Sequence, residues 1–367
     1  MQHPGELYLG LMSGTSLDGI DAVVVDLGQT SPKQIAKHYH PFDDALRNVL
    51  LKLHQPSHNE LHQTQLIGNQ LARLYAEAAG AVLSKANLSN KHIRAIGCHG
   101  QTIRHCPEHG YSMQIGNAAL LAELTGITVV SDFRSRDIAA GGQGAPLVPA
   151  FHDKLMRHPG IHRAIVNIGG ISNLTNLKPN KATSGFDCGP GNVLMDAWSR
   201  QHLGKPFDES GKWAASGSVL PGLLDKMLKE PFFYQPPPKS SGRDLFSLSW
   251  LGDRMSGTEA TEDVQATLLE LTCRSIAEAI NNHCSGAEEI YLCGGGAHNL
   301  ALHNRLATLL PVCSVQSTDA LGVDGDYMEA TAFAWLAQQN LHGKPANLPQ
   351  VTGSKHPCIL GAVYRQT

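Results

Sequence analysis

Charged residues are scarce in this sequence, and the two signs nearly balance. Of the 367 residues, 17% are Asp, Glu, Lys or Arg, and the formal net charge is −3. Such a balance gives no electrostatic reason to expect binding to nucleic acid or to an acidic membrane surface. No segment approaches the roughly 18 consecutive apolar residues of a membrane-spanning helix. We therefore expect neither a nucleic-acid partner nor a membrane partner.

Cysteine is also rare, and the first residues lack the features of a targeting signal. Eight cysteines in so long a chain are too few for a disulfide framework, so we expect reduced thiols packed as small hydrophobic side chains. The opening residues, MQHPGELYLG, have neither the basic start nor the apolar segment of a signal peptide. A cytoplasmic protein is expected. Its length suits about two domains, and 42% hydrophobic residues can build a sizeable core.

Two segments share one pattern, in which a hydrophobic strand, a turn of small residues and a second strand follow one another. They are YLGLMSGTSLDGIDAVVVDL, residues 8–27, and RAIVNIGGISNLTNL, residues 163–177. An ordinary hairpin needs only about two to five turn residues. The first turn runs from Ser13 to Gly19 and carries small hydroxyls and a carboxylate as well. The repeated pattern suggests two similar halves.

The rest of the chain alternates between strand and helix patterns, which predicts an α/β architecture. The Gly/Pro-rich stretch 141–149 is predicted to cross between domains, and the Pro-rich stretch 230–246 to form a surface loop. Apolar spacing predicts helices over 60–83, 262–280 and 326–339, and strands near 93–98, 127–130 and 288–293.

Three glycine-containing loops are candidates for binding an anion. They are SGTSLDG, NIGGISN and CGGGAHN, each at the end of a predicted strand. Glycine lets the chain approach a phosphate closely, so that backbone N–H groups can point at it. No Walker loop occurs, and no G-x-G-x-x-G follows a first strand. Two hairpin loops on phosphates and a third loop under a base together describe a nucleotide-binding cleft.

Seven long segments, spanning about residues 9–329, resemble the anhydro-N-acetylmuramic acid kinase family. That family lies in the superfamily that joins actin, the heat-shock chaperone ATPases and the sugar kinases. The resemblance implies a two-domain actin-like, ribonuclease H-like fold, with mixed sheets flanked by helices and an interdomain cleft. It implies a first domain of residues 1–140 plus about 330–367 and a second of 141–330. The segments are GLMSGTSLDGIDAVVVD, GCHGQTIRH, SDFRSRDIAAGGQGAPLVP, NIGGISNLT, GFDCGPGNVLMDAW, TEDVQATLLELT and LCGGGAHN.

The resemblance also implies a reaction with ATP and Mg²⁺. Members of the family open the internal 1,6 ether of the anhydro sugar released from peptidoglycan and phosphorylate the freed O6. The product is N-acetylmuramic acid 6-phosphate. Such an enzyme needs a base that activates water, together with positive groups and a metal that hold the phosphates in line.

Site residues on the sugar side follow from the matching motifs. Asp187, in GFDCGPGN, is implied as the base, although its local sequence alone fits a turn-capping Asp. Glu329 is implied near the anomeric carbon, where a carboxylate can stabilise oxocarbenium charge; an exposed helix Glu is the alternative. A guanidinium such as that of Arg134 can grip the lactyl carboxylate bidentately. The implied sugar-binding residues are His99, Gln101, Asp132 and Arg134.

Nucleotide contacts are implied in the three glycine loops. Asp18 could hold Mg²⁺ through water, but the sequence does not identify the metal ligands. The implied nucleotide-binding residues are Gly14, Thr15, Ser16, Asp18, Gly19, Asp21, Gly169, Gly170, Ser172, Gly294, Gly295, Gly296 and Asn299.

Several alternatives remain open at the level of sequence. Cys98, His99, His105, Cys106 and His109 crowd one segment, but a single close cluster without C-x-x-C gives poor zinc geometry. A chaperone-like ATPase would keep the three loops without needing the sugar-directed residues. An acyl-transfer enzyme with a serine nucleophile in GTSLDG lacks the G-x-S-x-G elbow. The oligomeric state is also open, a homodimer included.

Overall fold

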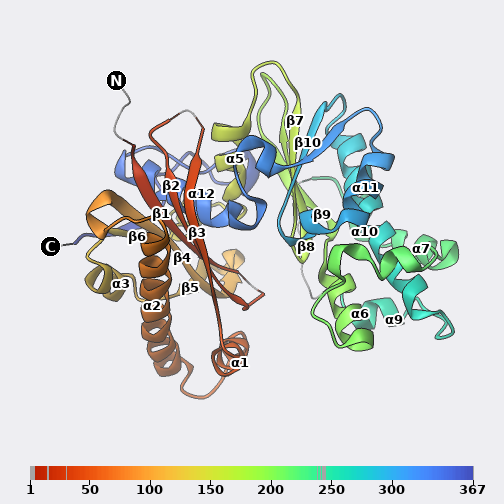
Figure 1. The fold of residues 1–367 in the computed structure, drawn as a ribbon, viewed down its shortest axis with the longest axis horizontal. Coiled ribbons are helices and arrows are strands. Elements are labelled where there is room, and N and C mark those ends of the chain that lie inside the picture. Colours follow the sequence, from red (N-terminus) through yellow and green to blue (C-terminus); the bar gives the residue numbers. More distant parts are fainter. Residues whose placement is uncertain are drawn as a thin grey trace. The chain divides into compact units, whose positions relative to one another are not determined.

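The hydrophobic strands form two separate mixed sheets, one in each of two units of the chain (Figure 1). The computed structural model describes residues 5–14, 16–29, 31–237, 239, 241 and 245–366. Unit 1 comprises residues 1–156 and 322–367, and unit 2 comprises residues 157–321. The domain limits implied by the family resemblance stay a prediction.

The sheet of unit 1 has the strand order β12-β6-β4-β1-β2-β3, with β5 paired to β4. Strands β1, β4 and β6 are parallel, whereas β2 runs antiparallel to both of its neighbours. The strands are β1 Leu7–Ser13, β2 Gly19–Asp26, β3 Lys33–Pro41, β4 Ile93–Cys106, β5 Tyr111–Ile115, β6 Val129–Ser131 and β12 Ala362–Tyr364.

The sheet of unit 2 has the order β11-β10-β7-β8-β9 and repeats the same arrangement. Its second strand, β8, is again the one that runs antiparallel to both neighbours, and β7, β10 and β11 are parallel. This strand order is that of the ribonuclease H-like fold, so the predicted fold class and the two similar halves are confirmed. The strands are β7 Arg163–Ile168, β8 Ile171–Leu177, β9 Ser184–Pro190, β10 Glu289–Cys293 and β11 Ser314–Ser317.

Helices cover both faces of the unit 1 sheet. The predicted helix over 60–83 is α2, and the spaced residues Ile67, Leu71 and Val82 are buried against the sheet. Successive side chains of a strand point to opposite faces. Leu9 and Leu11 of β1 pack with α2, so Gly10 faces the opposite side, where α12 lies. The helices are α1 Asp44–Leu53, α2 Glu60–Lys85, α3 Ala118–Thr125, α4 Ser135–Ala139, α5 Val148–Met156, α12 Met328–Leu341 and α13 Pro349–Thr352.

A pair of glycines lets α12 lie directly on the sheet. Gly10 of β1 and Gly97 of β4 are register partners in neighbouring strands. A Cβ atom at Gly10 would stand 1.8 Å from the carbonyl oxygen of Ala330, and one at Gly97 would stand 2.0 Å from that of Phe333. Any larger residue would therefore push the helix away. This close packing fixes the start of α12, and with it Glu329, near the ends of β1 and β2.

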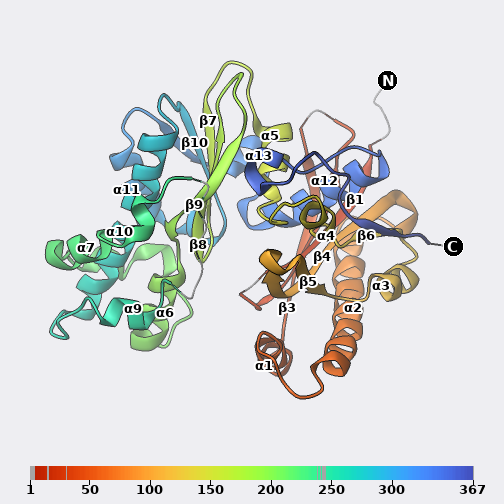
Figure 2. The same ribbon diagram turned by 180° about the vertical axis from the view of Figure 1, so that it is seen from behind.

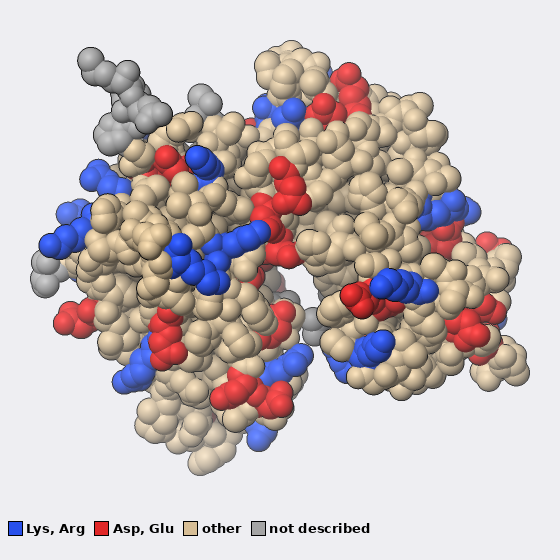
Figure 3. Space-filling model, in the orientation of Figure 1, with Lys and Arg blue, Asp and Glu red and all other residues tan. Residues whose placement is uncertain are grey.

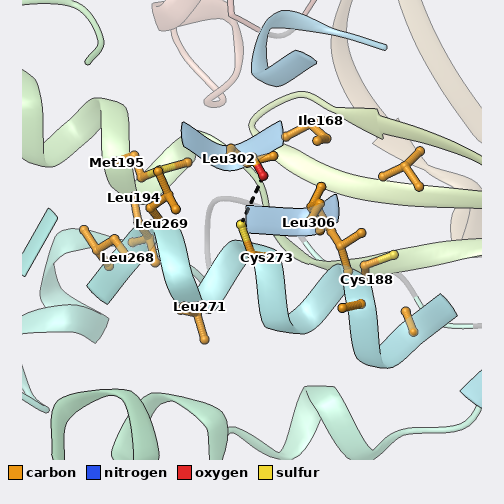
Figure 4. Close-up of a cluster of buried hydrophobic side chains, with 14 of the residues drawn as sticks. Ile168, Cys188, Leu194, Met195, Leu268, Leu269, Leu271, Cys273, Leu302 and Leu306 are labelled. Carbon is orange, nitrogen blue, oxygen red and sulfur yellow. Dashed lines mark hydrogen bonds between the residues drawn. The ribbon is translucent and has the colours of Figure 1, made fainter. Parts of the chain in front are cut away.

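The core of unit 2 lies around the predicted helix over 262–280, which is α10. Figure 4 shows Cys273 of α10 beside Leu302 and Leu306 of α11. The Cys273 thiol is buried and lies 3.7 Å from the Leu302 carbonyl oxygen. All eight cysteines are free thiols, and most are packed as small hydrophobic side chains, as predicted. The helices are α6 Val193–Leu203, α7 Pro221–Leu228, α8 Pro231–Tyr234, α9 Leu248–Gly252, α10 Thr261–His283 and α11 Leu300–Leu309.

Three local predictions are wrong. Residues after Cys98 do not leave the sheet but continue β4, which bends over to pair with β5. Asp187 lies within β9, paired across the sheet with Asn173, and not in a turn. The segment 230–246 is not simply a surface loop, because its aromatic side chains anchor it: Phe246 is fully buried.

Short 3-10 helices connect several of these elements. They are η1 Asn90–His92, η2 Pro107–His109, η3 Glu209–Gly211, η4 Ala214–Ser216, η5 Gly295–His298, η6 Thr318–Leu321 and η7 Gly325–Tyr327.

Charged side chains are interspersed over the surface. On the face shown in Figure 3, basic and acidic residues of the described chain lie among a majority of uncharged ones. Within the described ranges, every helix is too short or too polar to serve as a membrane span.

Candidate functional site

The loop between β1 and β2 is held by its backbone. Leu17 is buried and has a positive φ of 57°, and its N–H donates to the Gly14 carbonyl at 3.3 Å. The Gln101 amide, also buried, donates from Nε2 to the same carbonyl at 3.0 Å. The Tyr39 hydroxyl donates to the Asp18 carbonyl at 2.8 Å. Gln101, implied as a sugar contact, thus positions the loop.

Two side chains of this loop face outward. Ser16 and Asp18 are exposed, and the Ser16 hydroxyl donates to Asp18 Oδ1 at 2.7 Å. Gly19 serves packing, because a Cβ there would stand 2.5 Å from the His40 carbonyl oxygen. Thr15 lies outside the described residues. The loop therefore presents polar side chains, while hydrogen bonds to the Gly14 and Asp18 carbonyls hold its backbone in place.

Carboxylates gather around Asp21 on β2. Burial raises the pKa of the Asp21 carboxyl to about 7, and repulsion from Asp18, Glu329, Asp326 and Asp324 adds to the effect. Asp324 and Asp326 come from the segment that leads into α12, and Glu329 lies in the first turn of that helix. This group of five is called here the acidic group, and one of its members, Asp324, pairs with the Lys37 ammonium. Sequence reasoning missed Asp324 and Asp326, although VDGDYMEA, residues 323–330, places three acidic residues around the start of a predicted helix.

The acidic group does not by itself form a complete metal cage. Among the described residues, no three His, Cys, Asp or Glu side chains converge closely enough to hold a metal ion. Mg²⁺ commonly binds one or two carboxylates and completes its shell with water and substrate phosphates. A magnesium-nucleotide complex would therefore need only one or two carboxylates from the protein, with water and phosphate oxygens as the remaining ligands.

Arg134, just before α4, is oriented by two neutral acceptors. It donates from Nη1 to the Gly144 carbonyl at 2.7 Å and from Nη2 to His99 Nε2 at 2.9 Å. Burial, helped by the nearby Arg134 charge, lowers the pKa of His99 to about 3, so the imidazole is neutral and can accept. The His99 ring packs on Phe333 of α12 with centroids 4.6 Å apart. The structure thus brings two of the implied sugar-binding residues into direct contact.

The positive charge of Arg134 lacks a direct counter-ion. In the part of the chain that the structure describes, no carboxylate forms a hydrogen bond or ion pair with it. Burial lowers the pKa of the guanidinium, while Glu329 and Asp137 act in the opposite direction from a greater distance. Burial likewise raises the pKa of Glu329, against the effect of Arg134. A guanidinium in this setting is ready to pair with an anionic ligand.

A cavity of about 680 Å³ opens in unit 1 beside the middle of β4 and the carboxyl end of β6. His99 and Asp132 line it, together with the amides of Gln114 and Asn117. Asp132 is exposed, has a positive φ of 55°, and accepts a hydrogen bond from the Ser135 hydroxyl at 2.5 Å. The carboxyl ends of parallel strands are the usual place for ligands in α/β sheets. The other implied sugar residues, Gln101, Arg134 and Glu329, do not line this cavity.

In unit 2 the β7–β8 turn is joined to the loop after β9. The N–H groups of Gly191 and Asn192 donate to the carbonyls of Gly170 and Gly169 at 2.9 and 2.8 Å. Asn192 Nδ2 donates to the Ile168 carbonyl at 3.1 Å. A Cβ at Gly191 would stand 2.3 Å from the Gly169 carbonyl oxygen. Sequence reasoning missed Asn192, although GPGN directly follows a strand and precedes α6.

The triple-glycine loop after β10 packs against the end of β7, next to the β7–β8 turn. Gly294 has a positive φ of 76°, and a Cβ on it would stand 2.3 Å from Asn167 Oδ1. A Cβ on Gly296 would stand 2.2 Å from Ile168 Cγ2. Gly295 is exposed, and its nearest neighbour is the Asn192 amide, 3.8 Å from the position of a Cβ. Two of the three implied loops therefore converge at the ends of β7 and β10.

Two implied nucleotide contacts in unit 2 hold structural hydrogen bonds. The buried Ser172 hydroxyl donates to the Gly189 carbonyl at 3.1 Å. Asn299 caps α11, with Oδ1 accepting from the Leu302 N–H at 3.1 Å. Both side chains thus order the loops that they belong to.

Asp187 is half-buried on β9 beneath a short covering segment. Its Oδ2 accepts a hydrogen bond from the Ser241 N–H at 2.8 Å, and its own N–H donates to the Lys239 carbonyl at 3.0 Å. Burial raises the pKa of the Asp187 carboxyl to about 6, although the Ser241 N–H and the Lys239 charge oppose the rise. The Lys239 ammonium is held by the carbonyls of Phe232 and Phe233, both at 3.1 Å. A carboxylate with this pKa suits proton abstraction near neutral pH.

Comparison with known proteins gives one consistent family. Residues 6–366 match the sequence profile described as anhydro-N-acetylmuramic acid kinase. Curated relatives with that name include one from Nitrosospira multiformis, 57% identical over 97% of this chain and 98% of its own length. Another, from Thiobacillus denitrificans, is 55% identical over 99% of this chain and 98% of its own length. Among solved structures, component A of (R)-2-hydroxyglutaryl-CoA dehydratase from Acidaminococcus fermentans aligns with a TM-score of 0.49, at 13% identity, over 90% of this chain and 96% of that chain.

Proposed function

The chain belongs to the anhydro-N-acetylmuramic acid kinase family, and from this membership we propose its complete reaction. ATP, water and 1,6-anhydro-N-acetylmuramic acid give ADP and N-acetylmuramic acid 6-phosphate, in the recycling of peptidoglycan. The protein is thus a phosphotransferase that acts on a sugar hydroxyl. The observation in the structure that carries the ring-opening half is Asp187, whose pKa burial raises to about 6.

Asp187 is the base in this proposal. It takes a proton from water as the water oxygen bonds to the anomeric carbon. The bond between that carbon and O6 breaks, and its electron pair stays on O6. O6 then bonds to the γ-phosphorus while the bond from that phosphorus to the ADP oxygen breaks, and Asp187 later releases its proton to solvent. Because the Ser241 N–H occupies Oδ2, Oδ1 is the oxygen that receives the proton.

The residues of unit 1 bind the sugar in this proposal. Arg134 pairs with the lactyl carboxylate, which supplies the counter-ion that the guanidinium lacks. His99 and Asp132 line the adjoining cavity, and Gln101 acts by fixing the loop after β1. Glu329 stabilises positive charge at the anomeric carbon, and the nearby Arg134 favours its ionised form.

The glycine loops bind ATP in this proposal. Gly14, Thr15, Ser16 and Gly19 belong to the first phosphate loop, and the second and third loops belong to unit 2. There the exposed Gly295 has no side chain to keep a phosphate away from the backbone N–H groups. The second and third loops comprise Gly169, Gly170 and Ser172, then Gly294, Gly295, Gly296 and Asn299.

Magnesium fits the acidic group of unit 1. All of its donors are carboxylate oxygens, which Mg²⁺ prefers; burial, with repulsion from the other carboxylates added, raises the pKa of Asp21 to about 7. Asp18 and Asp21 would hold the ion, through water where the distance requires. When bound, the ion neutralises charge on the β- and γ-phosphates. A bound cation would in turn stabilise the ionised form of these carboxylates.

A cytoplasmic location and a homodimer belong to the proposal as well. Cell fractionation tests the first, and light scattering at several protein concentrations tests the second.

The deciding experiment measures ADP release from ATP and Mg²⁺ with and without 1,6-anhydro-N-acetylmuramic acid, and records the mass of the sugar product. Sugar-dependent ADP and a product heavier by one phosphate and one water establish both halves of the reaction. ADP release that ignores the sugar would instead indicate a chaperone-like ATPase or a kinase for another acceptor.

A further inference from the structure

Asp137 of α4 is a fully buried carboxylate three residues after Arg134. Its Oδ2 accepts a hydrogen bond from the Gly144 N–H at 2.8 Å. Its Oδ1 accepts from Asn347 Nδ2 at 2.6 Å and from the Thr352 hydroxyl at 2.7 Å. A buried carboxylate is tolerated only when donors such as these replace water. One oxygen therefore holds the 141–144 loop, and the other holds the segment around α13, which Figure 2 shows close to α4.

The 141–144 loop wraps tightly around this carboxylate. A Cβ at Gly142 would stand 2.2 Å from Asp137 Oδ2. Gly144 has a positive φ of 67°, and a Cβ on it would stand 2.8 Å from the Ile138 side chain. Little freedom remains for Gly144, whose N–H points at Asp137 and whose carbonyl accepts from Arg134 Nη1 at 2.7 Å.

Asp137 reaches Arg134 only through Gly144. No hydrogen bond joins the two side chains in the described structure, although their charges interact. A direct ion pair would satisfy the guanidinium and reduce its attraction for another anion. Two neutral acceptors, the Gly144 carbonyl and the His99 imidazole, instead fix the guanidinium and leave its charge available.

We propose that Asp137 is a positioning residue that, through Gly144, aims the Arg134 guanidinium at the carboxylate of an acidic sugar. The proposal rests on the proposed function, because it assigns Arg134 to the lactyl carboxylate. It adds a residue that touches neither substrate nor nucleotide. A displacement of about 1 Å in such a donor is enough to weaken a bidentate contact strongly.

The test compares two sugars that differ by the carboxylate. Binding of 1,6-anhydro-N-acetylmuramic acid and of 1,6-anhydro-N-acetylglucosamine, which lacks the lactyl group, is measured by calorimetry. Asp137→Ala should weaken the first sugar by about tenfold or more, the size of one charged hydrogen bond, and leave the second little changed. The KM for the acidic sugar should rise by a similar factor, with kcat and the KM for ATP nearly constant.

A matched control separates positioning from stability. The double variant Asn347→Ala with Thr352→Val removes the partners of Oδ1 but keeps the bond from Oδ2 to Gly144. It should lower the unfolding midpoint while preserving the preference for the acidic sugar. Equal loss of that preference in the control and in Asp137→Ala would overturn the proposal.

Two further variants keep the test decisive. If Asp137→Ala does not fold, Asp137→Asn is measured in the same way, and equal weakening of both sugars refutes positioning. Adding Asp137→Ala to Arg134→Ala should cost no further affinity, because both act on one contact. If these variants leave the preference unchanged while the wild-type enzyme shows sugar-dependent ADP release, only this inference fails. If the wild-type enzyme shows no such release, the proposed function itself fails.

Discussion

The β1–β2 hairpin of unit 1 and the β7–β8 hairpin of unit 2 hold equivalent places in sheets of the same strand order. The first carries Asp18 and Asp21 and lies beside further carboxylates, whereas the second has no acidic residue and is tied by backbone hydrogen bonds to Gly191 and Asn192. The carboxylate of unit 2 to which we assign the role of base is Asp187, on its third strand. The strand order thus fixes where groups are presented, while each sequence decides which chemistry appears there.

The largest expected effect tests the unit 2 side of this comparison. Replacing Asp187 with Asn removes the proposed base and should lower kcat by about 10²–10⁴-fold. Nucleotide affinity, measured by calorimetry with ADP, should stay close to that of the wild type. Asp253→Asn, an exposed residue of the same unit, is the control. Turnover near the wild-type rate in the Asp187 variant removes this residue from the role of base.

The pH dependence of turnover sharpens the same assignment. Because burial raises the pKa of Asp187 to about 6, its carboxyl is ionised above that pH and protonated below it. We expect kcat/KM to be level above neutrality and to fall about tenfold for each pH unit well below 6. Steady-state rates between pH 5 and 8.5 give the profile. A flat profile would contradict the assignment.

The next prediction concerns the packing of α12 on the sheet of unit 1. Gly10→Ala would place a methyl group 1.8 Å from the Ala330 carbonyl oxygen. Overpacking of this kind costs about 1–3 kcal/mol or more in the free energy of unfolding. Activity should fall too, because Glu329 moves with the helix. Urea denaturation and steady-state rates measure both.

Gly80→Ala is the matched control for that substitution. Gly80 is exposed within α2, and a Cβ there would meet nothing within 4 Å. Alanine in a helix interior is better than glycine by about 0.5–1 kcal/mol, so this variant should be slightly more stable than the wild type. Equal stability of the two variants would show that α12 does not depend on the bare surface at Gly10.

A smaller effect tests the acidic group. The pKa of Asp21 is raised from 3.8 to about 7 in the folded protein, so its ionised form destabilises the fold above that pH. The destabilisation fades as the pH falls toward the value of the unfolded chain. Asp21→Asn should therefore raise the free energy of unfolding at pH 8 by on the order of 1 kcal/mol, and change little at pH 4.

Magnesium should remove the stability advantage of Asp21→Asn over the wild type. With ATP and Mg²⁺ present, wild-type Asp21 is stabilised by the cation and the variant is not, so the difference in thermal midpoint should shrink or change sign. An Asp21→Asn variant that is less stable than the wild type at pH 8 without ligand would contradict the repulsion that this carboxyl experiences.

The smallest effect compares a helix cap in each unit. Asn299→Ala and Asp43→Ala each remove the side chain that caps a helix, α11 in unit 2 and α1 in unit 1. Each should cost about 1 kcal/mol of stability. Only the first should also raise the KM for ATP, because Asn299 follows the triple-glycine loop. Equal KM values for the two variants would separate that loop from the nucleotide.

Local patterns predicted the α/β class, whereas the family resemblance supplied the actin-like fold. The strand pairs over 8–27 and 163–177 and the helices α2 and α10 follow from apolar periodicity, which depends on near neighbours. The strand that holds Asp187 could not be recognised in that way. Its glycine and proline residues are typical of turns, and its place in the sheet depends on pairing with β8.

The sequence motifs predict a set of site residues, but they do not predict how those residues are arranged. The motifs named Arg134, His99 and Glu329, yet the acceptors of the guanidinium are a backbone carbonyl and an imidazole. Because neither acceptor is charged, no pattern of charged residues in the sequence could have indicated these contacts. The acidic group joins β2 to a segment that begins near residue 324, so its repulsion appears only once the chain has folded.

Unit 1 is built from two stretches of chain, and its second stretch leaves the ribosome only after all of unit 2. At a synthesis rate of roughly 5–20 residues per second, residues 157–321 take roughly 10–30 s to emerge. Throughout that time the face of the first sheet that carries Gly10 and Gly97 is not yet covered by α12. A nascent chain therefore has an apolar surface for molecular chaperones to cover, and a translation product that stops before residue 329 lacks one of the carboxylates proposed for the sugar site.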